Sequence, residues 1–399
     1  MAEAAPAGAW RAAAALACTQ TVHWGSLFYA FSVLMPEVSA EMGWSRGTVV
    51  GAFSAGLLVQ AVAGLGIGPL LDRLGPRGIM AAGSVMASLG LLAVGQSNSL
   101  TAFYLAWCGI GVVMAATLYE AAFTAIAAAF GQAAMRPGIA LVTFAGGLAS
   151  TVFWPLTAWM VEAQGWREAC QSLALLNLLC APLHALLLPG RVRRQPPTNS
   201  LPAPEITLHA ALRGGRFWAL AFVNGAVGLT GAALGVHLVP LLEERSLGSA
   251  APLLAGLMGV AQLAGRVAEF YTARRLSLGR IGVVALVALA LAGLLLGWGQ
   301  DVTVLGAGIF LYGLANGIMT IVRGGLPARF FGTGHYGAIS SALAAPGALM
   351  RAAGPWAAGW LWQIGGSYAW PMTVLALIAL LATLVLGFFV REGARTPPR

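Results

Sequence analysis

Three arginines, Arg266, Arg323 and Arg351, interrupt stretches that are otherwise apolar enough to cross a lipid bilayer. A guanidinium keeps its charge in proteins, and placing one at the centre of a membrane costs at least about 2.5–3.5 kcal/mol. Such a charge is therefore expected to face an internal partner, a cavity or a passing anion. Its planar fork of N–H groups matches the two oxygens of a carboxylate, whether that carboxylate belongs to the protein or to a passing anion.

The three arginines have competing interpretations. Arg266 lies about two-thirds of the way through its apolar stretch and either binds a substrate carboxylate or pairs with Glu269, one helical turn away. Arg351 lies among prolines and glycines that leave backbone groups free to line a cavity, and a structural ion pair is equally open. Arg323 ends its stretch near the cytoplasm and is interpreted as a structural residue whose side chain reaches the interface.

Glu120 is the single carboxylate deep in the first half of the chain, directly after Tyr119. Apolar surroundings favour its neutral form and a nearby arginine favours its charged form, so it can exchange a proton as its partner changes. A permanent bridge from Glu120 to an arginine is the alternative. His23 is the second candidate for proton coupling, although a lone histidine in an apolar stretch is often a hydrogen-bonded core residue.

Further residues are candidates for lining a substrate cavity. Tyr312 and Asn316, four residues apart, share one face of a helix. Tyr29 and Tyr119 are the candidates in the first half. Trp24, Trp218, Trp360 and Trp370 lie near the ends of predicted spans and fit an aromatic belt at the membrane interface.

Composition places these residues in a membrane protein. The chain has 399 residues, of which 59% are hydrophobic and only 9% charged, with a mean hydropathy of +0.81. Soluble proteins carry about 25% charged residues. The net charge of +9 comes from arginines in short loops between apolar stretches, which argues against nucleic-acid binding.

Enzymatic classes are disfavoured by what the sequence lacks. All 22 basic residues are arginine, which excludes a P-loop lysine and Schiff-base chemistry. The sequence shows no catalytic triad, metal cluster or cofactor motif, so we expect neither an enzyme nor a cofactor. The four cysteines show no CxxC spacing and are interpreted as packing residues.

The pattern of apolar stretches predicts an all-α membrane protein with twelve transmembrane helices, because each stretch reaches the roughly 20 residues that span a bilayer. With the first residue inside, 16 arginines fall in cytoplasmic segments and only Arg46, Arg167 and Arg245 fall outside. We therefore expect a monomeric, multi-pass protein of the bacterial inner membrane, with both termini cytoplasmic. The predicted spans are 12–35, 48–70, 77–97, 101–129, 138–162, 167–188, 216–242, 250–270, 281–299, 303–323, 337–362 and 368–390.

A basic, proline-containing segment at 191–215 divides these spans into six plus six. The sequence thus predicts a six-helix bundle over 1–190, a cytoplasmic linker over 191–215 and a second six-helix bundle over 216–399. Paired bundles joined in this way suggest a central cavity.

The loop after the second span carries a specific motif that runs from Gly68 through Asp72-Arg73 and Gly75 to Arg77. Gly68 permits close helix contact, Asp72 places a charge at the membrane boundary, and Gly75 turns the short loop. The motif resembles G-x-L-x-D-R-x-G-x-R of the major facilitator superfamily, and the resemblance covers essentially the whole chain. It implies that these residues form a gating latch between two six-helix bundles.

A second resemblance concerns the monocarboxylate and oxalate/formate transporter branch of that family. It is carried by Phe28–Pro36, by the run Glu41-Met-Gly-Trp-Ser-Arg46 and by the pair Gly265-Arg266. It implies that Arg266 binds a substrate carboxylate and that Arg351 occupies a span where the oxalate/formate branch places a lysine. Glu269 stands where the second gating motif usually begins, so a symmetric second latch is in doubt.

These observations favour a secondary transporter of a small organic anion, most simply a monocarboxylate. We expect alternating access with proton coupling or exchange. Two alternatives stay open: an efflux carrier for amphipathic drugs or metabolites, and a transporter-like receptor that binds a ligand without moving it.

Overall fold

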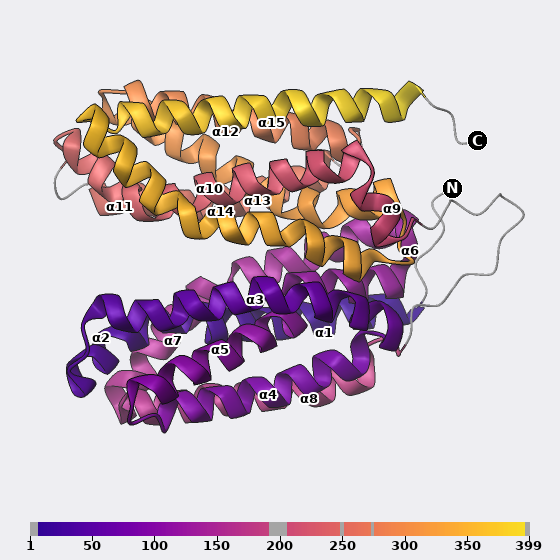
Figure 1. The fold of residues 1–399 in the computed structure, drawn as a ribbon, viewed down its shortest axis with the longest axis vertical. Helices are drawn as coiled ribbons and strands as arrows, with labels where there is room; N and C mark the ends of the chain where they lie inside the picture. Colours follow the sequence, from indigo (N-terminus) through magenta and orange to yellow (C-terminus); the bar gives the residue numbers. More distant parts are fainter. Residues whose placement is uncertain (1–6, 191–205, 248–250, 273–274, 396–399) are drawn as a thin grey trace, which may run out of the picture. The chain divides into compact units, whose positions relative to one another are not determined.

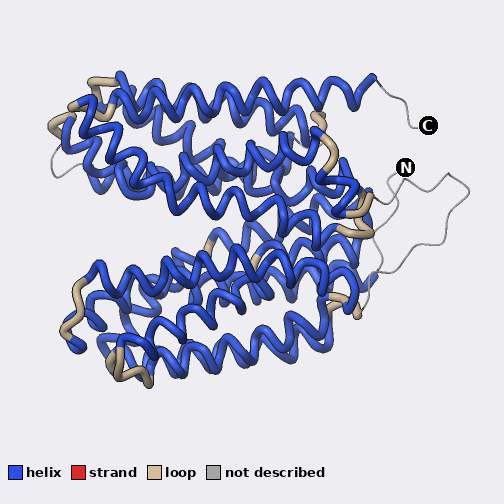
Figure 2. Tube along the Cα trace, in the orientation of Figure 1, coloured by secondary structure: helices blue, strands red, loops and turns tan. Residues whose placement is uncertain are grey.

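The computed structural model describes residues 7–190, 206–247, 251–272 and 275–395. Within these ranges the chain is helical, with short turns and no strand (Figure 2). Nine segments of the described chain are long and apolar enough to cross a membrane. The first, eighth and eleventh predicted spans are not among these nine.

The chain divides into two compact units, whose helices are labelled in Figure 1. Unit 1 comprises residues 1–208 and 327–345, and unit 2 comprises residues 209–326 and 346–399. The boundary near residue 208 lies inside the predicted linker, of which residues 191–205 lie outside the described chain. Residues 327–345, which the sequence division assigns to the second bundle, pack with unit 1.

The helices follow the predicted spans, but the first and fourth spans are each divided into shorter helices. In unit 1 they are α1 (Ala7–Trp24), η1 (Gly25–Tyr29), α2 (Ala30–Met42), α3 (Arg46–Leu74), α4 (Pro76–Gly95), α5 (Leu100–Thr117), α6 (Tyr119–Gly147), α7 (Ala149–Gln164) and α8 (Trp166–Leu187). The remaining helices are α9 (Leu208–Leu212), α10 (Gly215–Glu244), α11 (Ala251–Thr272), α12 (Leu278–Trp298), α13 (Val302–Phe331), α14 (Tyr336–Gly365) and α15 (Ala369–Arg395). In each unit the third and sixth spans lie side by side, α4 along α8 and α12 along α15 (Figure 1).

Two irregularities shape the interior of unit 1. The first span contains the π-helical turn η1, where Gly25 lets α7 approach so closely that a Cβ would overlap the Phe153 ring. The fourth span breaks at Leu118, whose ψ of −162° is extended, so that α5 ends and α6 begins in the middle of one apolar stretch. Such departures from regular α-helix are frequent at functional sites.

Trp24 lies at the midpoint of the first span, at the junction of α1 and η1. The expectation that it belongs to an interfacial belt is therefore wrong. The first span begins earlier and ends later than the sequence indicated, because α1, η1 and α2 run without interruption from Ala7 to Met42.

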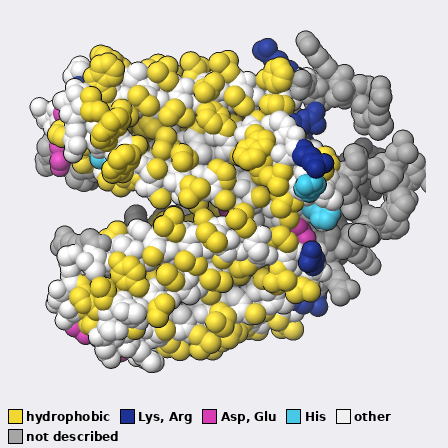
Figure 3. All heavy atoms as spheres, in the orientation of Figure 1, with side chains coloured by type: hydrophobic (Ala, Val, Ile, Leu, Met, Phe, Trp, Pro, Cys, Tyr) yellow, Lys and Arg dark blue, Asp and Glu magenta, His cyan; other side chains and the backbone are white. Residues whose placement is uncertain are grey.

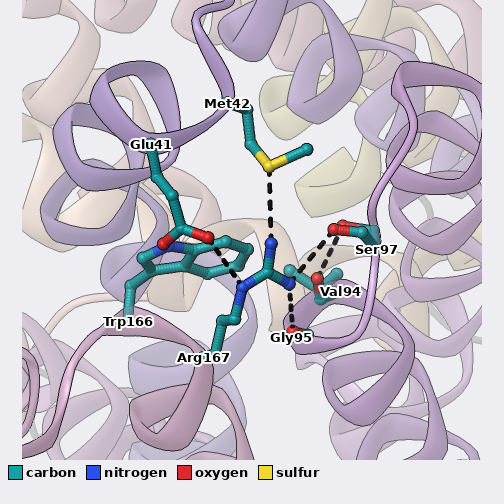
Figure 4. Close-up of polar contacts among 7 residues, drawn as sticks. All are labelled: Glu41, Met42, Val94, Gly95, Ser97, Trp166 and Arg167. Atoms are coloured by element: carbon teal, nitrogen blue, oxygen red, sulfur yellow. Dashed lines mark hydrogen bonds and ion pairs between the residues drawn. The ribbon is translucent and has the colours of Figure 1, made fainter.

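One end of unit 1 is tied together by a cluster around Glu41, shown in Figure 4. The Glu41 carboxylate accepts hydrogen bonds from Trp166 Nε1 at 2.5 Å and Arg167 Nε at 2.9 Å. The same guanidinium donates to the carbonyl oxygens of Gly95 and Ser97, where α4 ends. This Glu41 cluster therefore joins the end of the first span to the start of α8 and the end of α4.

Unit 2 has a corresponding cluster around Glu244, at the end of α10. Its carboxylate accepts hydrogen bonds from Trp362 Nε1, the Ser367 hydroxyl and the Tyr368 N–H, which precedes α15. Arg245 donates to the Gly297 carbonyl oxygen near the end of α12 at 2.6 Å. In each unit, a glutamate joins the first and sixth spans and an arginine caps the third.

Apolar side chains dominate the flanks of each unit, and the visible charged side chains gather at the helix ends (Figure 3). This distribution suits a protein whose flanks contact lipid, because a charge is stable at the interface and costly at the centre.

Candidate functional site

Arg266 is buried within α11, with 9% of its surface exposed. Its Nε has no hydrogen-bond partner, and among the described residues no ion pair reaches its guanidinium. The alternative of an Arg266–Glu269 pair is therefore not what the structure shows. Glu269 is 1% exposed and makes other interactions. A buried guanidinium without an anion is unfavourable unless a ligand supplies one.

Close helix packing fixes the position of Arg266. The preceding residue, Gly265, approaches α13 so closely that a Cβ would overlap the Leu314 carbonyl oxygen, and Gly317 approaches Gln262 in the same way. Glycines at these two positions let α11 and α13 cross at backbone contact. The crossing holds the arginine at a defined depth in unit 2.

The other candidates of unit 2 have varied surroundings. Arg323 is half-buried with an unpartnered Nε, and α13 continues for eight residues to Phe331, so the expectation that Arg323 ends this helix is wrong. Tyr312 is 3% exposed and Asn316, one turn further along α13, is half-buried. Arg351 lies exposed on α14 and has interactions of its own.

Glu120 lies in the first turn of α6, immediately after the break at Leu118. Its side chain is half-buried, and no ion pair involves its carboxylate in the part of the chain that the structure describes. A permanent Glu120–arginine bridge is thus absent from those residues. An acidic group in a first helical turn is stabilised by the backbone dipoles of the helix.

Aromatic side chains from three helices gather around Trp24 and Tyr119, the residue that precedes Glu120. Tyr119 stacks on Phe123 with ring centroids 5.3 Å apart and lies 4.9 Å from the Trp24 ring. Tyr29, at the end of η1, contacts Phe28 and Trp24. The structure therefore brings together two predicted residues, Tyr29 and Tyr119, with three that the sequence reasoning missed. The i, i+4 spacing of Trp24 with Phe28 and of Tyr119 with Phe123 is the signal that would have found them.

His23 is fully buried and belongs to a chain of hydrogen bonds between α1, α4 and α8. Its Nδ1 lies 2.8 Å from Asn177 Oδ1, and its Nε2 lies 3.2 Å from the Ser84 hydroxyl. The same hydroxyl lies 3.0 Å from His184 Nδ1, and His184 Nε2 lies 2.9 Å from the Thr19 hydroxyl. The sequence reasoning found only the first of these five residues, because the others come from distant segments.

The directions of these hydrogen bonds follow from the fixed acceptors. Asn177 Nδ2 donates to the Leu173 carbonyl oxygen, so its Oδ1 must accept from His23 Nδ1–H. His184 Nδ1 faces the Met80 carbonyl oxygen and therefore also carries a proton. The Ser84 hydroxyl then accepts from His184, and its single proton lies between His23 Nε2 and the Met80 carbonyl oxygen, which is 3.0 Å away. Each ring nitrogen of the two histidines has a hydrogen-bond partner, which is typical of a structural polar core.

The predicted latch residues lie within unit 1. The Asp72 carboxylate accepts hydrogen bonds from the backbone N–H groups of Gly337 and Ala338, both at 2.8 Å, in the first turn of α14. Gly68 approaches Gly337 so closely that a Cβ at either position would overlap the other's carbonyl oxygen. Gly75 adopts a φ of +83° in the turn between α3 and α4. Anionic side chains are stabilised at such helix N-termini.

The two arginines of the motif behave differently. Arg77 Nε donates to the Leu188 carbonyl oxygen at the end of α8, so it stabilises unit 1 internally. Arg73 is exposed. No group of three or more acidic, histidine or cysteine side chains is placed to hold a metal ion among the residues searched.

Comparison with known proteins places this geometry in a family. The profile of the Major Facilitator Superfamily matches residues 16–355. An uncharacterized 38 kDa protein of Thermoproteus tenax is 29% identical over 384 residues, covering 92% of each chain. Monocarboxylate transporter 13 of Bos taurus is 27% identical, covering 78% of this chain and 71% of its own length.

Solved structures show the same fold. The human organic anion transporter MFSD10 superposes with a TM-score of 0.75 at 20% identity, covering 96% of this chain and all of that one. The predicted all-α fold of twelve membrane-spanning helices in two six-helix bundles is thereby confirmed. The chain belongs to the major facilitator superfamily of membrane transporters.

Proposed function

We propose that the chain is a secondary transporter of a small organic anion, most simply a monocarboxylate. The buried, unpartnered guanidinium of Arg266 carries this proposal. A bidentate carboxylate would satisfy its donors and offset the cost of the buried charge. Similarity to a monocarboxylate transporter over most of the chain supports the same substrate class.

Other residues are assigned to the substrate by the chemistry of their surroundings. Tyr312 and Asn316 follow one face of α13, which packs against α11 beside Arg266. Tyr29 and Tyr119 supply aromatic contact in unit 1. Arg351 is a second, exposed cation of unit 2.

Alternating access requires a contact that forms in one state of the carrier and breaks in another. The bonds from Asp72 to the first turn of α14 are the candidate, because they join α3 to a distant helix through two charge-assisted hydrogen bonds. Asp72→Asn keeps the shape of the side chain but removes the charge. We expect several-fold slower turnover with little change in substrate affinity.

Distances between spin labels on α3 and α14, together with transport rates, would measure this effect. Glu37→Gln is the matched control, because it removes the charge of an exposed carboxylate in α2 that lies outside the latch motif. An unchanged distribution of distances in Asp72→Asn, with turnover at the wild-type rate, would exclude the gating role.

Proton coupling is assigned to Glu120. Its side chain is half-buried in the first turn of α6, whereas His23 is enclosed with both ring nitrogens bonded. We therefore rank Glu120 before His23 as the residue that exchanges a proton. The arginine distribution predicts that both termini lie on the cytoplasmic side of the membrane, and we assign the carrier to the bacterial inner membrane as part of this proposal.

Uptake into proteoliposomes tests the function. The panel comprises labelled monocarboxylates and dicarboxylates, measured with and without a pH gradient. Saturable uptake of monocarboxylates that rises with the gradient is the expected result. Transport of neutral amphipathic compounds alone would favour the efflux alternative, and specific binding without uptake would favour a receptor.

A further inference from the structure

Unit 2 contains a second arginine whose position parallels that of Arg266. Arg323 lies on α13, whose end at Phe331 is eight residues, or about 12 Å, further along the helix. Its side chain is half-buried, its Nε has no hydrogen-bond partner, and among the described residues no ion pair reaches its guanidinium. Arg323 is therefore placed away from the helix end, where its charge would be least costly.

The contacts between α11 and α13 fix the relative direction of the two helices. Each glycine of α13 that approaches α11 meets a residue further along α11 than the glycine before it. The pairs, in order, are Gly306 with Leu254, Gly313 with Met258 and Gly317 with Gln262. The two helices therefore run in the same direction along this line of contact.

The same contacts show that Arg266 and Arg323 lie at a similar depth. A Cβ at Gly317 would overlap the Gln262 carbonyl oxygen, so these two residues are level with each other. Arg266 is four residues beyond Gln262, and Arg323 is six residues beyond Gly317. At a rise of about 1.5 Å per residue these advances are about 6 Å and about 9 Å, so the two arginines differ in depth by only about 3 Å.

The two arginines also lie on the same side of the α11–α13 pair. Successive residues of an α-helix are rotated by about 100° around its axis. Arg266 lies about 100° beyond the line of contact on α11, and Arg323 lies about 100° before the line of contact on α13. Since the helices are parallel and face each other, these opposite rotations place both arginines on one side.

Neighbouring helices support this placement. Gly325 approaches α12 on another side of α13. Tyr312 and Asn316 lie within about 20° of Arg323 around the axis of α13. The Tyr312 hydroxyl is 3.4 Å from the position of a Cβ at Gly231 on α10. The side that carries Arg323 therefore faces α10 and holds the two polar residues already assigned to the substrate.

Two guanidiniums on one side and at one depth repel each other, and neither can be relieved by losing a proton. Glu269 is the buried carboxylate of α11, but it has interactions of its own and none reaches either arginine in the described chain. A ligand with one negative charge would leave one of the two cations uncompensated. A ligand with two negative charges would compensate both.

We propose that Arg266 and Arg323 together bind a short dicarboxylate, with one carboxylate at each guanidinium. Both residues belong to unit 2. Packed helices have axes about 8–10 Å apart, and glycine contacts bring them to the short end of this range, so few carbons separate the two carboxylates. The ligand reaches Arg266 past Arg323 and Asn316, which are both half-buried.

This assignment rests on the proposed anion transport and names a substrate class for it. A second charge-assisted pair should lower the KM for a dicarboxylate at least about tenfold relative to a monocarboxylate of the same length. Succinate and butanoate are the matched acids, because they have the same number of carbons. Their uptake is compared at a pH where both carboxyl groups of succinate are ionised.

The decisive variant is Arg323→Gln, which removes the second charge and keeps a long polar side chain. It should raise the KM for succinate at least about tenfold and leave that for butanoate within about twofold, because Arg266 still binds one carboxylate. Arg329→Gln is the matched control on the same helix, because Arg329 is exposed and shares the face of Gly325 that approaches α12. Its preference for succinate should equal that of the wild type.

A second measurement avoids dependence on turnover. Succinate should raise the melting temperature of the purified wild-type protein more than butanoate does, and Arg323→Gln should lose that difference. Arg323→Lys retains the charge without the planar fork, so it should keep part of the preference. It replaces Arg323→Gln if the melting curve without ligand shows that the glutamine variant does not fold.

The outcomes separate the two proposals. Equal KM values for succinate and butanoate in the wild type would overturn the dicarboxylate site and leave anion transport intact. A preference for succinate that persists in Arg323→Gln would overturn the role of Arg323. Failure of the wild type to transport any acid would overturn the proposed function, and the dicarboxylate site with it.

Discussion

The buried polar residues of the two units differ in how they are satisfied. In unit 1 the chain from Thr19 through His184, Ser84 and His23 to Asn177 has a partner for every ring nitrogen. In unit 2 Arg266 is almost as buried but has no anionic partner among the described residues. Both arrangements lie within membrane-spanning helices, where an unpaired polar group is costly.

This difference distinguishes residues that stabilise the fold from residues that bind a ligand. A network whose members satisfy one another gains nothing from a ligand and holds three helices in fixed positions. A charge left without a partner is unfavourable until something supplies one. We therefore expect variants in the two regions to change different quantities: stability in unit 1, and substrate transport in unit 2.

The largest effect is expected from Arg266→Lys. An ammonium keeps the charge but cannot reproduce a bidentate fork, so anion uptake should fall about a hundredfold. Arg280→Lys is the control, because Arg280 lies exposed in the first turn of α12. Initial rates in proteoliposomes provide the measurement. Wild-type rate and affinity in Arg266→Lys would assign this arginine to structure and remove the main support for an anion.

Glu120 of unit 1 differs from the satisfied network, since its carboxylate has no ion pair in the described chain. Glu120→Gln imitates the protonated form permanently. It should reduce accumulation driven by a pH gradient at least about tenfold and leave exchange at equal concentrations measurable. Glu37→Gln, at an exposed site in α2, is the control. Undiminished pH-driven accumulation would direct attention to His23 or to a carrier without proton coupling.

Ser84→Ala breaks the unit 1 network with the least steric change. It leaves His23 Nε2 without a hydrogen-bond partner, and a buried unpaired group costs about 1–3 kcal/mol of unfolding free energy. Melting curves in detergent would show the loss. Ser88→Ala, one turn further along α4 and outside the network, should cost less. If Ser84→Ala instead spares stability and abolishes proton coupling, the network transfers protons and our structural interpretation is wrong.

The smallest effects are expected at the Glu41 and Glu244 clusters, which offer a second comparison between the two units at more exposed positions. Glu41 has a cationic partner, Arg167, whereas Glu244 accepts from neutral donors. The hydrogen bond from Arg167, and then that from Trp166, lowers the pKa of Glu41. Burial acts to raise the pKa of Glu244, but hydrogen bonds from Trp362, the Tyr368 N–H and Ser367, together with the charge of Arg245, outweigh it and the pKa is lowered.

Because the folded-state pKa of Glu41 is lowered, its contribution to stability is present above its ordinary pKa of 4.5 and is lost as pH falls below that value. The side chain is 49% exposed, so the contribution is at most about 1 kcal/mol. Glu41→Gln should therefore shift the melting temperature slightly, and 0.5 M salt should shrink the shift. The shift from Glu244→Gln should depend less on salt. Equal salt dependence in the two variants would contradict the distinction.

Sequence by itself determined the membrane class, the helical fold and the family. Apolar stretches long enough to cross a bilayer leave the helix as the simplest way to satisfy the backbone, so these features follow from local composition. The motif at Gly68–Arg77 could be interpreted residue by residue from the sequence. Gly68 permits a close approach of helices, Asp72 places a charge at a helix boundary, and Gly75 forms a turn with positive φ. Arg266 stood out because its charge is permanent.

Only the tertiary structure decided which buried polar groups have partners. His23 and Gln20 look alike in sequence, as polar residues three apart in one apolar stretch. His23 meets Asn177 and Ser84 from distant helices, whereas Gln20 meets a carbonyl that is free only because the fourth span breaks at Leu118. Hydrogen-bond partners in a helical membrane protein come from other helices, so no local pattern could have distinguished the satisfied side chain from the unsatisfied one.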